Sequence, residues 1–288
     1  MEKRASLKEF IEAPEILVMP GAHDGMSAKI AAALGFKALI CTDFGCSAIV
    51  LGKPDYGLIS VSEMAHQIRT VSGVSGLPVL GDGGCGFGNP LNVYRAVQEY
   101  ELAGASGMTL EDQVYPKRCG HMEGKQVIGR EEMVKKLKAA LKARSGSGFI
   151  ICARTDSIAT HGLEEAIARA NAYGEAGADM VWADAMPSKE AIEEFVKRVG
   201  KPVMVAFVEG GRTPTVTVKE LEAMGVAVVT FGLSSIFSSA KATWEVLSLI
   251  REEGSTARYL ERMMAFEEFS ELVGLKEMRE QEREFGSG

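Results

Sequence analysis

The segment at residues 117–121 places one cysteine among basic side chains. Cys119 follows Lys117 and Arg118, precedes His121 by two positions and has a glycine beside it. Positive charge near a thiol lowers its pKa, and a group that titrates near neutral pH can transfer a proton. The connection that contains it, residues 111–130, is long enough to be a functional loop. We therefore interpret Cys119 as a functional thiol; a structural cysteine is the alternative, but buried structural cysteines seldom have such polar neighbours.

A second set of candidates consists of acidic side chains and one arginine that follow short apolar runs. They are Asp24, Asp43, Asp82, Glu111, Arg154, Asp156, Asp184 and Glu209. In an α/β barrel such positions converge on one rim, where barrel enzymes carry their chemistry. Several carboxylates around one arginine indicate a divalent cation with oxygen ligands, Mg²⁺ or Mn²⁺. Zinc is disfavoured because no set of cysteines and histidines has the spacing of a structural zinc site.

Two of these acids have a simpler explanation. Aspartate often caps the helix that follows it, and we expect this of Asp24 and Asp184. Capping does not explain Asp82, which lies in the glycine-rich stretch 81–88. Glycines there would let the backbone approach a ligand closely.

The elements that must position these residues are short strands alternating with amphipathic helices. Strands are predicted at 16–19, 38–41, 78–80, 107–110, 149–153, 180–183, 203–207 and 226–231, because each run is apolar at successive positions, as in strands buried on both faces. Helices are predicted at 24–34, 91–103, 131–143 and 163–176. Eight such units without a flexible linker favour a closed (β/α)8 TIM barrel over two domains. We expect one catalytic domain over 1–288, with 254–284 as a helical C-terminal extension.

Composition excludes several other classes of protein. Of the 288 residues 46% are hydrophobic and 25% charged, which allows a packed core and disfavours disorder. The net charge of −7, without a basic run, argues against a nucleic-acid partner. No apolar run approaches the roughly 20 residues that span a bilayer, and the first residues lack a signal peptide. Five scattered cysteines are more simply free thiols than disulfides, so we expect a cytoplasmic protein.

The cysteine motif at 117–121, with Glu111, Asp112 and Gln113 before it, resembles the signature of the isocitrate lyase / phosphoenolpyruvate mutase superfamily. Within it the sequence is most similar to the short-chain lyases, 2-methylisocitrate lyase and 2,3-dimethylmalate lyase, and to related oxaloacetate-cleaving enzymes. The mutase branch lacks this cysteine motif, so phosphorus–carbon bond formation is disfavoured. Supporting stretches lie in the same order along the chain, at 20–24, 51–57, 153–156 and 209–214.

The resemblance implies a retro-aldol cleavage of a small 2-hydroxy carboxylic acid. It implies that Asp82 binds the metal directly, with Glu111 and Asp55 bound through water. It assigns proton donation to Cys119 and a clamp on substrate oxygens to Arg154, while Lys117 and His121 tune the thiol or bind a carboxylate. Substrate contacts are implied at Thr42, Asp43, Phe44, Gly120, Glu209 and Thr213.

Three positions depart from the family pattern. An Asp-x-Asp sequence after the third strand reads Asp82-Gly83-Gly84, a Ser-Gly-Gly-like turn reads Thr42-Asp43-Phe44, and an asparagine shortly before Glu209 is replaced by Ala206. We hypothesise that Asp43 partly replaces the missing carboxylate and that Gly84 and Ala206 enlarge the pocket for a different substrate. Drift toward lost activity is the alternative.

Other activities and an assembly remain as expectations. Hydrolysis or decarboxylation of an oxaloacetate-like 2-oxo acid is a second enzymatic possibility, and a non-catalytic barrel that binds a carboxylate or a partner protein is a third. Apolar side chains near the C-terminus, among them Met263, Met264 and Phe266, indicate a segment that packs on another element or subunit. The resemblance implies a homotetramer in which a late helix is exchanged between barrels.

Overall fold

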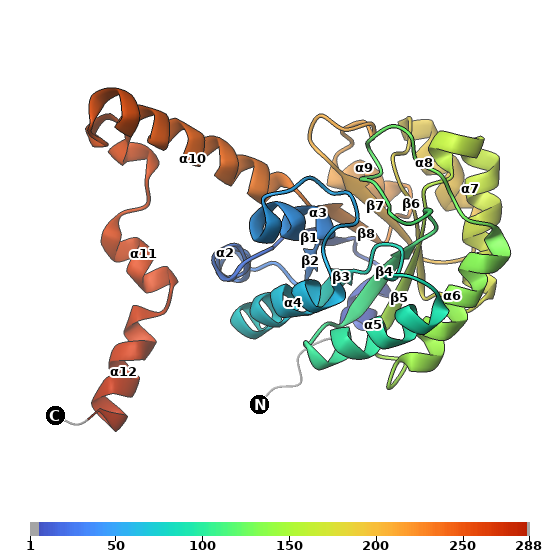
Figure 1. The fold of residues 1–288 in the computed structure, drawn as a ribbon, viewed down its shortest axis with the longest axis horizontal. Helices are drawn as coiled ribbons and strands as arrows, with labels where there is room; N and C mark the ends of the chain where they lie inside the picture. The colour runs from blue at the N-terminus through green and yellow to red at the C-terminus, as the bar shows by residue number, and fades with distance from the viewer. Residues whose placement is uncertain (1–5, 287–288) are drawn as a thin grey trace.

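Eight parallel strands form one sheet that curls into a nearly closed barrel (Figure 1). The computed structural model describes residues 6–286; the first five residues, where we expected no signal peptide, lie outside the described part. Neighbouring strands are hydrogen-bonded in the order β1-β8-β7-β6-β5-β4-β3-β2, and a parallel bridge from Gly21 to Ile40 links β1 to β2. The strands are β1 Leu17–Pro20, β2 Leu39–Cys41, β3 Val79–Asp82, β4 Gly107–Glu111, β5 Ile150–Thr155, β6 Met180–Ala183, β7 Val203–Phe207 and β8 Val228–Phe231. The predicted TIM barrel is confirmed.

The predicted strands are all present. Strands β3, β4 and β5 continue past their predicted C-terminal ends, and this extension includes residues of the candidate site. Asp82 and Glu111 are the last residues of β3 and β4, and Arg154 is the last but one of β5. In the register of β4 with β5, Glu111 stands beside Arg154. These side chains are therefore carried by the sheet itself, which holds them more rigidly than a loop would.

Apolar side chains close the barrel interior and one of its ends. The interior cluster includes Met19, Ile40 and Leu80 from three strands. Leu7 and Ile11 of α1 (Leu7–Ile11) belong to the same cluster and are buried. Since that cluster also contains residues from the beginnings of strands, α1 covers the end opposite to the polar strand ends.

Helices between the strands cover the outside of the barrel. They are α2 Gly25–Ala33, α3 Asp43–Cys46, the π-helix η1 Ser47–Leu51, α4 Val61–Ser75, α5 Pro90–Leu102, α6 Arg130–Ala143, α7 Ile158–Glu175, α8 Lys189–Arg198 and α9 Val218–Ala223. Asp24 caps α2, as predicted, by accepting a hydrogen bond from the Ser27 amide at 2.7 Å. A cap of this kind stabilises a helix by about 1 kcal/mol.

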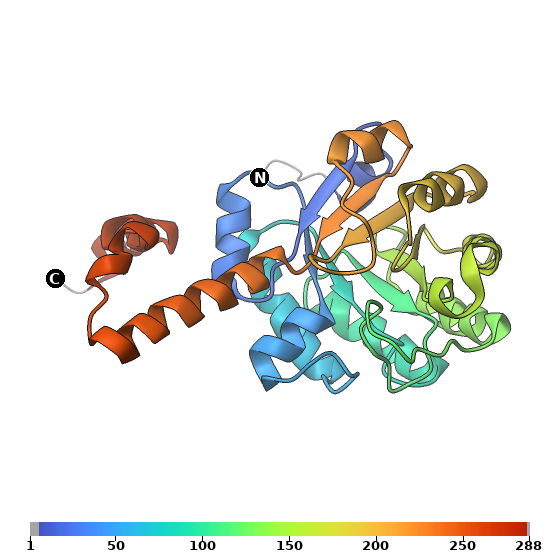
Figure 2. The ribbon, with the colours of Figure 1, turned by 90° about the horizontal axis from the view of Figure 1, so that it is seen from above.

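The last helices leave the barrel. Helix α10 (Ser234–Glu253) follows β8, contains no buried residue and projects outward (Figures 1 and 2). Beyond it, η2 (Ala257–Arg262), α11 (Phe266–Leu272) and α12 (Leu275–Phe285) form what we call the C-terminal arm, which stands largely apart from the barrel. Trp244 of α10 is 74% exposed and Phe266 of the arm 84%. Among the helices of residues 6–286, none has the length and apolar character to cross a bilayer.

Candidate active site

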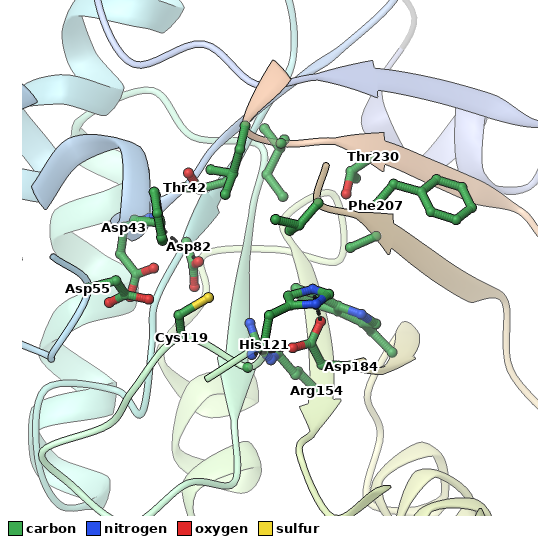
Figure 3. Close-up of a pocket in the computed structure, with 18 residues that line it drawn as sticks. Thr42, Asp43, Asp55, Asp82, Cys119, His121, Arg154, Asp184, Phe207 and Thr230 are labelled. Atoms are coloured by element: carbon green, nitrogen blue, oxygen red, sulfur yellow. Dashed lines mark hydrogen bonds and ion pairs between the residues drawn. The ribbon is translucent and has the colours of Figure 1, made fainter. Parts of the chain in front are cut away.

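A pocket opens at the barrel end where the strands finish (Figure 3). The ends of β2, β3, β5, β6, β7 and β8 contribute to its wall, together with the loop between β4 and α6. The lining residues are Ile40, Thr42, Asp43, Phe44, Asp55, Asp82, Cys119, Gly120, His121, Arg154, Trp182, Asp184, Ala206, Phe207, Val208, Thr230, Gly232 and Leu233. Barrel enzymes carry their chemistry at this end.

The pocket collects most of the residues chosen from the sequence. Thr42, Asp43, Phe44, Asp55, Asp82, Cys119, Gly120, His121 and Arg154 line it. The sulfur of Cys119 lies between the side chains of Asp82 and Arg154 (Figure 3). Lys117 and Glu111 lie behind the wall, where Lys117 Nζ is 2.7 Å from Asp55 Oδ2 and Glu111 Oε2 is 3.3 Å from Arg154 Nη1.

Two expected substrate contacts are not brought to the wall. Glu209 is exposed and accepts a hydrogen bond from the hydroxyl of Ser234. Thr213 is buried, but it does not line the pocket, and its hydroxyl has no hydrogen-bond partner among the described residues. Both belong to the loop after β7, whose path cannot be read from local sequence.

Arg154 is held on several sides by carboxylates. Its Nε and Nη2 donate to the two carboxylate oxygens of Asp156 at 2.8 and 3.0 Å, and Nη2 also donates to Asp184 Oδ2 at 2.9 Å. The guanidinium lies 4.3 Å from the ring centre of Trp182. Burial opposes its charge, but Asp156, Asp184 and Glu111 outweigh burial and raise the pKa of Arg154. The side chain is thus a fixed cation at the centre of the pocket.

The expectation that Asp184 caps a helix is wrong. Ser188, not Asp184, accepts the capping hydrogen bond from the Ala191 amide at the start of α8. The amide of Asp184 donates to the carbonyl of Thr155 at 3.0 Å, which places the carboxylate against Arg154. The serine four residues further on was the signal in the sequence that another residue caps this helix.

Lys117 is a buried cation among the acids at the opposite side of the pocket. Its Nζ forms ion pairs with Asp43 and Asp55, and all three side chains are buried. Burial works against the charge of Lys117, but Asp43, Glu111 and Asp55 overcome it and raise the pKa of the ammonium. Burial likewise disfavours the charge of Asp82, yet Lys117 and Arg154 lower the pKa of that carboxyl.

The acids at this side fit a Mg²⁺ or Mn²⁺ ion that keeps most of its waters. Among residues 6–286 no group of three or more His, Cys, Asp or Glu side chains is arranged to hold a metal by itself. Within the described part of the chain, Oδ1 of Asp55 and Oε2 of Glu111 are nevertheless buried without a hydrogen bond, although Oε2 is ion-paired with Arg154 at 3.3 Å. Four carboxylates, on Asp43, Asp55, Asp82 and Glu111, also lie close together there, and burial raises the pKa of Asp43 and raises that of Glu111 to about 8. A bound cation would favour the charged forms of these acids. Mg²⁺ is commonly bound through one or two carboxylates and water.

The loop that carries Cys119 is folded down over Arg154. A Cβ on Gly120 would lie 1.5 Å from Asp184 Oδ2 and 2.4 Å from Arg154 Nη2, so only glycine allows this approach. Buried Lys125 donates to the carbonyl of Gly120 and lies 3.3 Å from Asp156 Oδ1. Lys125 was missed because nothing in its local sequence marks a lysine that becomes buried.

His121 joins this loop to the loop after β7. Its Nδ1 accepts a hydrogen bond from the amide of Arg212 at 2.9 Å, so the proton of the neutral ring resides on Nε2. Nε2 is buried, has no hydrogen-bond partner among the described residues and lies 3.9 Å from Asp184 Oδ1. Burial lowers the pKa of His121, against the opposing effect of Asp184. The neutral ring therefore offers an N–H donor to an oxygen in the pocket.

The expectation of a lowered thiol pKa at Cys119 is wrong. Burial raises the pKa of Cys119 to about 12, and the His121 amide and Arg154 only partly offset it. Lys117, two residues before Cys119, forms ion pairs with Asp43 and Asp55 instead of interacting with the thiol. A thiol that stays protonated fits a proton donor and does not fit a nucleophile.

Together these groups can hold a small carboxylic acid and protonate one of its carbons. Arg154 and the Nε2 proton of His121 line the pocket, where they can donate hydrogen bonds to carboxylate or carbonyl oxygens of a ligand. A protonated thiol stands beside them, and the loop that covers Arg154 could exclude water and so protect a carbanion from unwanted protonation. The fold and the site are those of a barrel enzyme, with groups suited to binding a small carboxylic acid.

The chain belongs to the phosphoenolpyruvate phosphomutase family, because the model of that family matches residues 7–251. It is 40% identical to 2,3-dimethylmalate lyase of Eubacterium barkeri over 288 residues, with all of both chains covered. It is 38% identical to 2-methylisocitrate lyase of Aeropyrum pernix, covering 96% of this chain and 89% of the relative. The chain is thus an enzyme of the isocitrate lyase / phosphoenolpyruvate mutase superfamily and a lyase.

Solved structures agree with this assignment. A structure of oxaloacetate acetylhydrolase with the inhibitor 3,3-difluorooxalacetate superimposes with a TM-score of 0.93 at 33% identity, covering 98% of this chain and 97% of the other. A phosphonopyruvate hydrolase complex with oxalate and Mg²⁺ has a TM-score of 0.89 at 28% identity, covering all of both chains. Mg²⁺ and a small carboxylate thus occur together in a protein of this fold.

Proposed function

We propose that the protein cleaves the carbon–carbon bond of a 2-hydroxy di- or tricarboxylate, of the alkylmalate or 2-methylisocitrate type, by a Mg²⁺-assisted retro-aldol reaction. The observation that carries this proposal is the position of a protonated thiol in the same pocket as Asp82 and Arg154. The names of the two lyase relatives support the choice of substrate class.

Mg²⁺ (or Mn²⁺) would be held by Asp82 directly and by Glu111 and Asp55 through water. When bound, the ion stabilises negative charge on the substrate hydroxyl and carboxylate oxygens. Arg154 and His121 orient the carboxylate of the fragment that leaves. The loop that carries Cys119 keeps water away from the bound substrate and from the fragment that leaves.

In the reaction a carboxylate beside Lys117 takes the proton of the substrate hydroxyl, and the adjacent carbon–carbon bond breaks. One fragment becomes a 2-oxo acid. The bonding electron pair goes to the other fragment as an enediolate-like carboxylate, and the Sγ–H of Cys119 donates its proton to the carbon. The thiolate regains a proton before the next cycle, so the products together contain the atoms of the substrate.

A panel of 2-hydroxy di- and tricarboxylates with Mg²⁺ tests the proposal. We expect pyruvate or glyoxylate from at least one of them, and Cys119→Ser to lower kcat by about 100-fold or more, as for loss of an acid catalyst. Met122→Leu, in the same loop but outside the pocket wall, is the matched control. No turnover by any acid, or turnover unaffected by Cys119→Ser, would remove this mechanism.

Hydrolysis or decarboxylation of an oxaloacetate-like acid is the second candidate. It is favoured by the close superposition on oxaloacetate acetylhydrolase. Acetate and oxalate formed from oxaloacetate, without 2-oxo acid from any 2-hydroxy acid, would identify this activity. Binding of the acids without any turnover would indicate a diverged barrel for a new carboxylate.

We also propose a homotetramer in which α10 and the C-terminal arm pack on a neighbouring barrel. Trp244 and Leu247 of α10 are exposed and apolar, and a groove between α2 and the first half of α10 includes the apolar side chains Met26 and Ile30 of α2. Burying such side chains favours association. Light scattering after size exclusion should give the mass of four chains, and a smaller mass for Trp244→Glu. Leu102→Glu, at a similarly exposed position on α5, should not change the mass.

Free thiols support a cytoplasmic location, as proposed from the composition. All five cysteines are unpaired in the described structure. No observation favours nucleic acid or a membrane as a partner. A fractionation experiment with a tagged chain tests the location.

A further inference from the structure

The pocket has two chemically different ends. Asp43, Asp55 and Asp82 line one end, with Lys117 behind them. The other end is built from Ile40, Phe44, Ala206, Phe207, Val208 and Leu233. In Figure 3 Asp43, Asp55 and Asp82 lie on one side of the Arg154–Asp184 pair, and Phe207 lies on the other. A substrate anchored at the acidic end therefore extends toward an apolar wall.

The apolar end offers little to a carboxylate. Among the lining residues that the structure describes, Arg154 is the one cationic side chain, and three carboxylates already surround it. Thr230, a strand neighbour of Ala206 in the register of β7 and β8, and Thr42 contribute uncharged polar side chains to the lining. A carboxylate that loses its water against this wall would keep few hydrogen bonds, which is costly.

The same wall suits an alkyl group. Ala206 and Leu233 line the cavity, are each less than 10% exposed and offer it only carbon atoms from their side chains. Each methylene buried against such a surface improves binding by about fourfold. Phe44 packs edge-on against Phe237 of α10 with ring centres 6.0 Å apart, which holds this side of the wall in place.

We propose that the substituent that the substrate directs away from the acidic end is an alkyl group and not a third carboxylate. The substrate is then an alkyl-substituted 2-hydroxy dicarboxylate, and Ala206, Val208 and Leu233 determine this specificity. The inference rests on the proposed lyase function, which leaves di- and tricarboxylates open.

Two acids form a matched pair for the test. 2,3-Dimethylmalate and 2-methylisocitrate share the same 2-hydroxy-2-methyl centre and differ in carrying methyl or carboxymethyl at carbon 3. We expect kcat/KM to favour the dimethyl acid by about 100-fold or more, within the range over which a pocket discriminates by unpaired polar groups. Extending the methyl to ethyl should raise kcat/KM further. Equal rates, or a preference for the tricarboxylate, would overturn the proposal.

A charge introduced at the apolar end should reverse part of this preference. Val208 is half-buried at the pocket wall, so Val208→Lys keeps contact with water and should fold. We expect it to narrow the ratio between the two acids by at least tenfold, while Val208→Leu, which keeps the wall apolar, does not narrow it. A ratio that Val208→Lys does not alter would show that this wall does not contact the substituent.

The failure of the lyase function can be told apart from the failure of this inference. If neither acid is cleaved, the dissociation constants of both are measured by calorimetry with Mg²⁺ present. Tighter binding of the dimethyl acid would retain the alkyl specificity and remove only the lyase reaction. Tighter binding of the tricarboxylate, or binding of neither acid, would overturn the specificity itself.

Discussion

The carboxylate of Asp43 lies 3.4 Å from the position that a Cβ on Gly84 would occupy. The two residues are far apart in sequence, yet a Cβ at position 84 would be in van der Waals contact with the Asp43 carboxylate. The amide of Gly84 also donates to Asp82 Oδ1 at 3.1 Å, so all three residues share one corner of the pocket. This proximity supports the hypothesis that Asp43 supplies the carboxylate that the family pattern places at position 84.

Replacing Asp43 should therefore weaken metal binding. We expect Asp43→Ala to lower Mg²⁺ affinity by about tenfold or more, the effect typical of losing a group that supports metal ligands. Calorimetric titration with Mg²⁺ measures it. Asp24→Ala, which removes a helix cap remote from the acids, should leave the affinity unchanged. An unchanged affinity for Asp43→Ala would show that Asp43 does not compensate for Gly84.

A methyl group at position 120 should prevent the cysteine loop from closing. In Gly120→Ala the new Cβ would collide with Asp184 and Arg154, so the loop must lift and carry Cys119 away from its place. We expect kcat/KM to fall by about 100-fold, because a displacement of about 1 Å can have that effect on a reacting group. Gly129→Ala is the control in the same connection, since no atom lies within 4 Å of its added Cβ. Equal activity of the two variants would mean that the closed loop is not needed.

Alkylation of Cys119 should be slow at ordinary pH. Only the thiolate reacts, and a pKa of about 12 instead of the usual 9.0 makes the thiolate scarce. The higher nucleophilicity of a more basic thiolate recovers part of that loss, which leaves iodoacetamide about 30-fold slower than with a model thiol. Peptide mass spectrometry at pH 8 follows the rate at Cys119, with N-acetylcysteine as reference. If Cys119 reacted with iodoacetamide as fast as N-acetylcysteine does, the pKa of its thiol would not be raised.

Acid should weaken the contact between the loop that carries Cys119 and the loop after β7, because His121 joins the two loops by accepting a hydrogen bond from the Arg212 amide. The folded-state pKa of His121 lies below the ordinary 6.5, so the unfolded chain takes up this proton first as the pH falls. The stability that the neutral ring contributes is complete above about pH 6.5 and declines below it. We expect the unfolding temperature of the wild type to fall more between pH 7 and pH 5 than that of His121→Gln, which keeps an acceptor for the Arg212 amide without titrating there. Parallel falls for both proteins would contradict this role.

The residues of the barrel and most of its pocket could be predicted from sequence. Runs such as 203–207 are apolar at every position, a pattern that suits strands buried on both faces, and the order of strands and helices leaves few topologies. Asp82, Glu111 and Arg154 stand at the ends of such runs, so their convergence follows from the parallel arrangement alone. For this reason the order of strands along the chain is enough to predict which of these residues share the pocket.

Tertiary structure alone decided the properties that depend on distant partners. Burial makes Cys119 a weak acid, although its neighbours in sequence are basic, because Lys117 is bound by Asp43 and Asp55. Asp184 meets Arg154 instead of capping a helix. Local sequence records charge and helix-forming tendency, but solvation and ion pairing depend on which groups the fold brings within a few ångströms, and those groups come from other strands and loops.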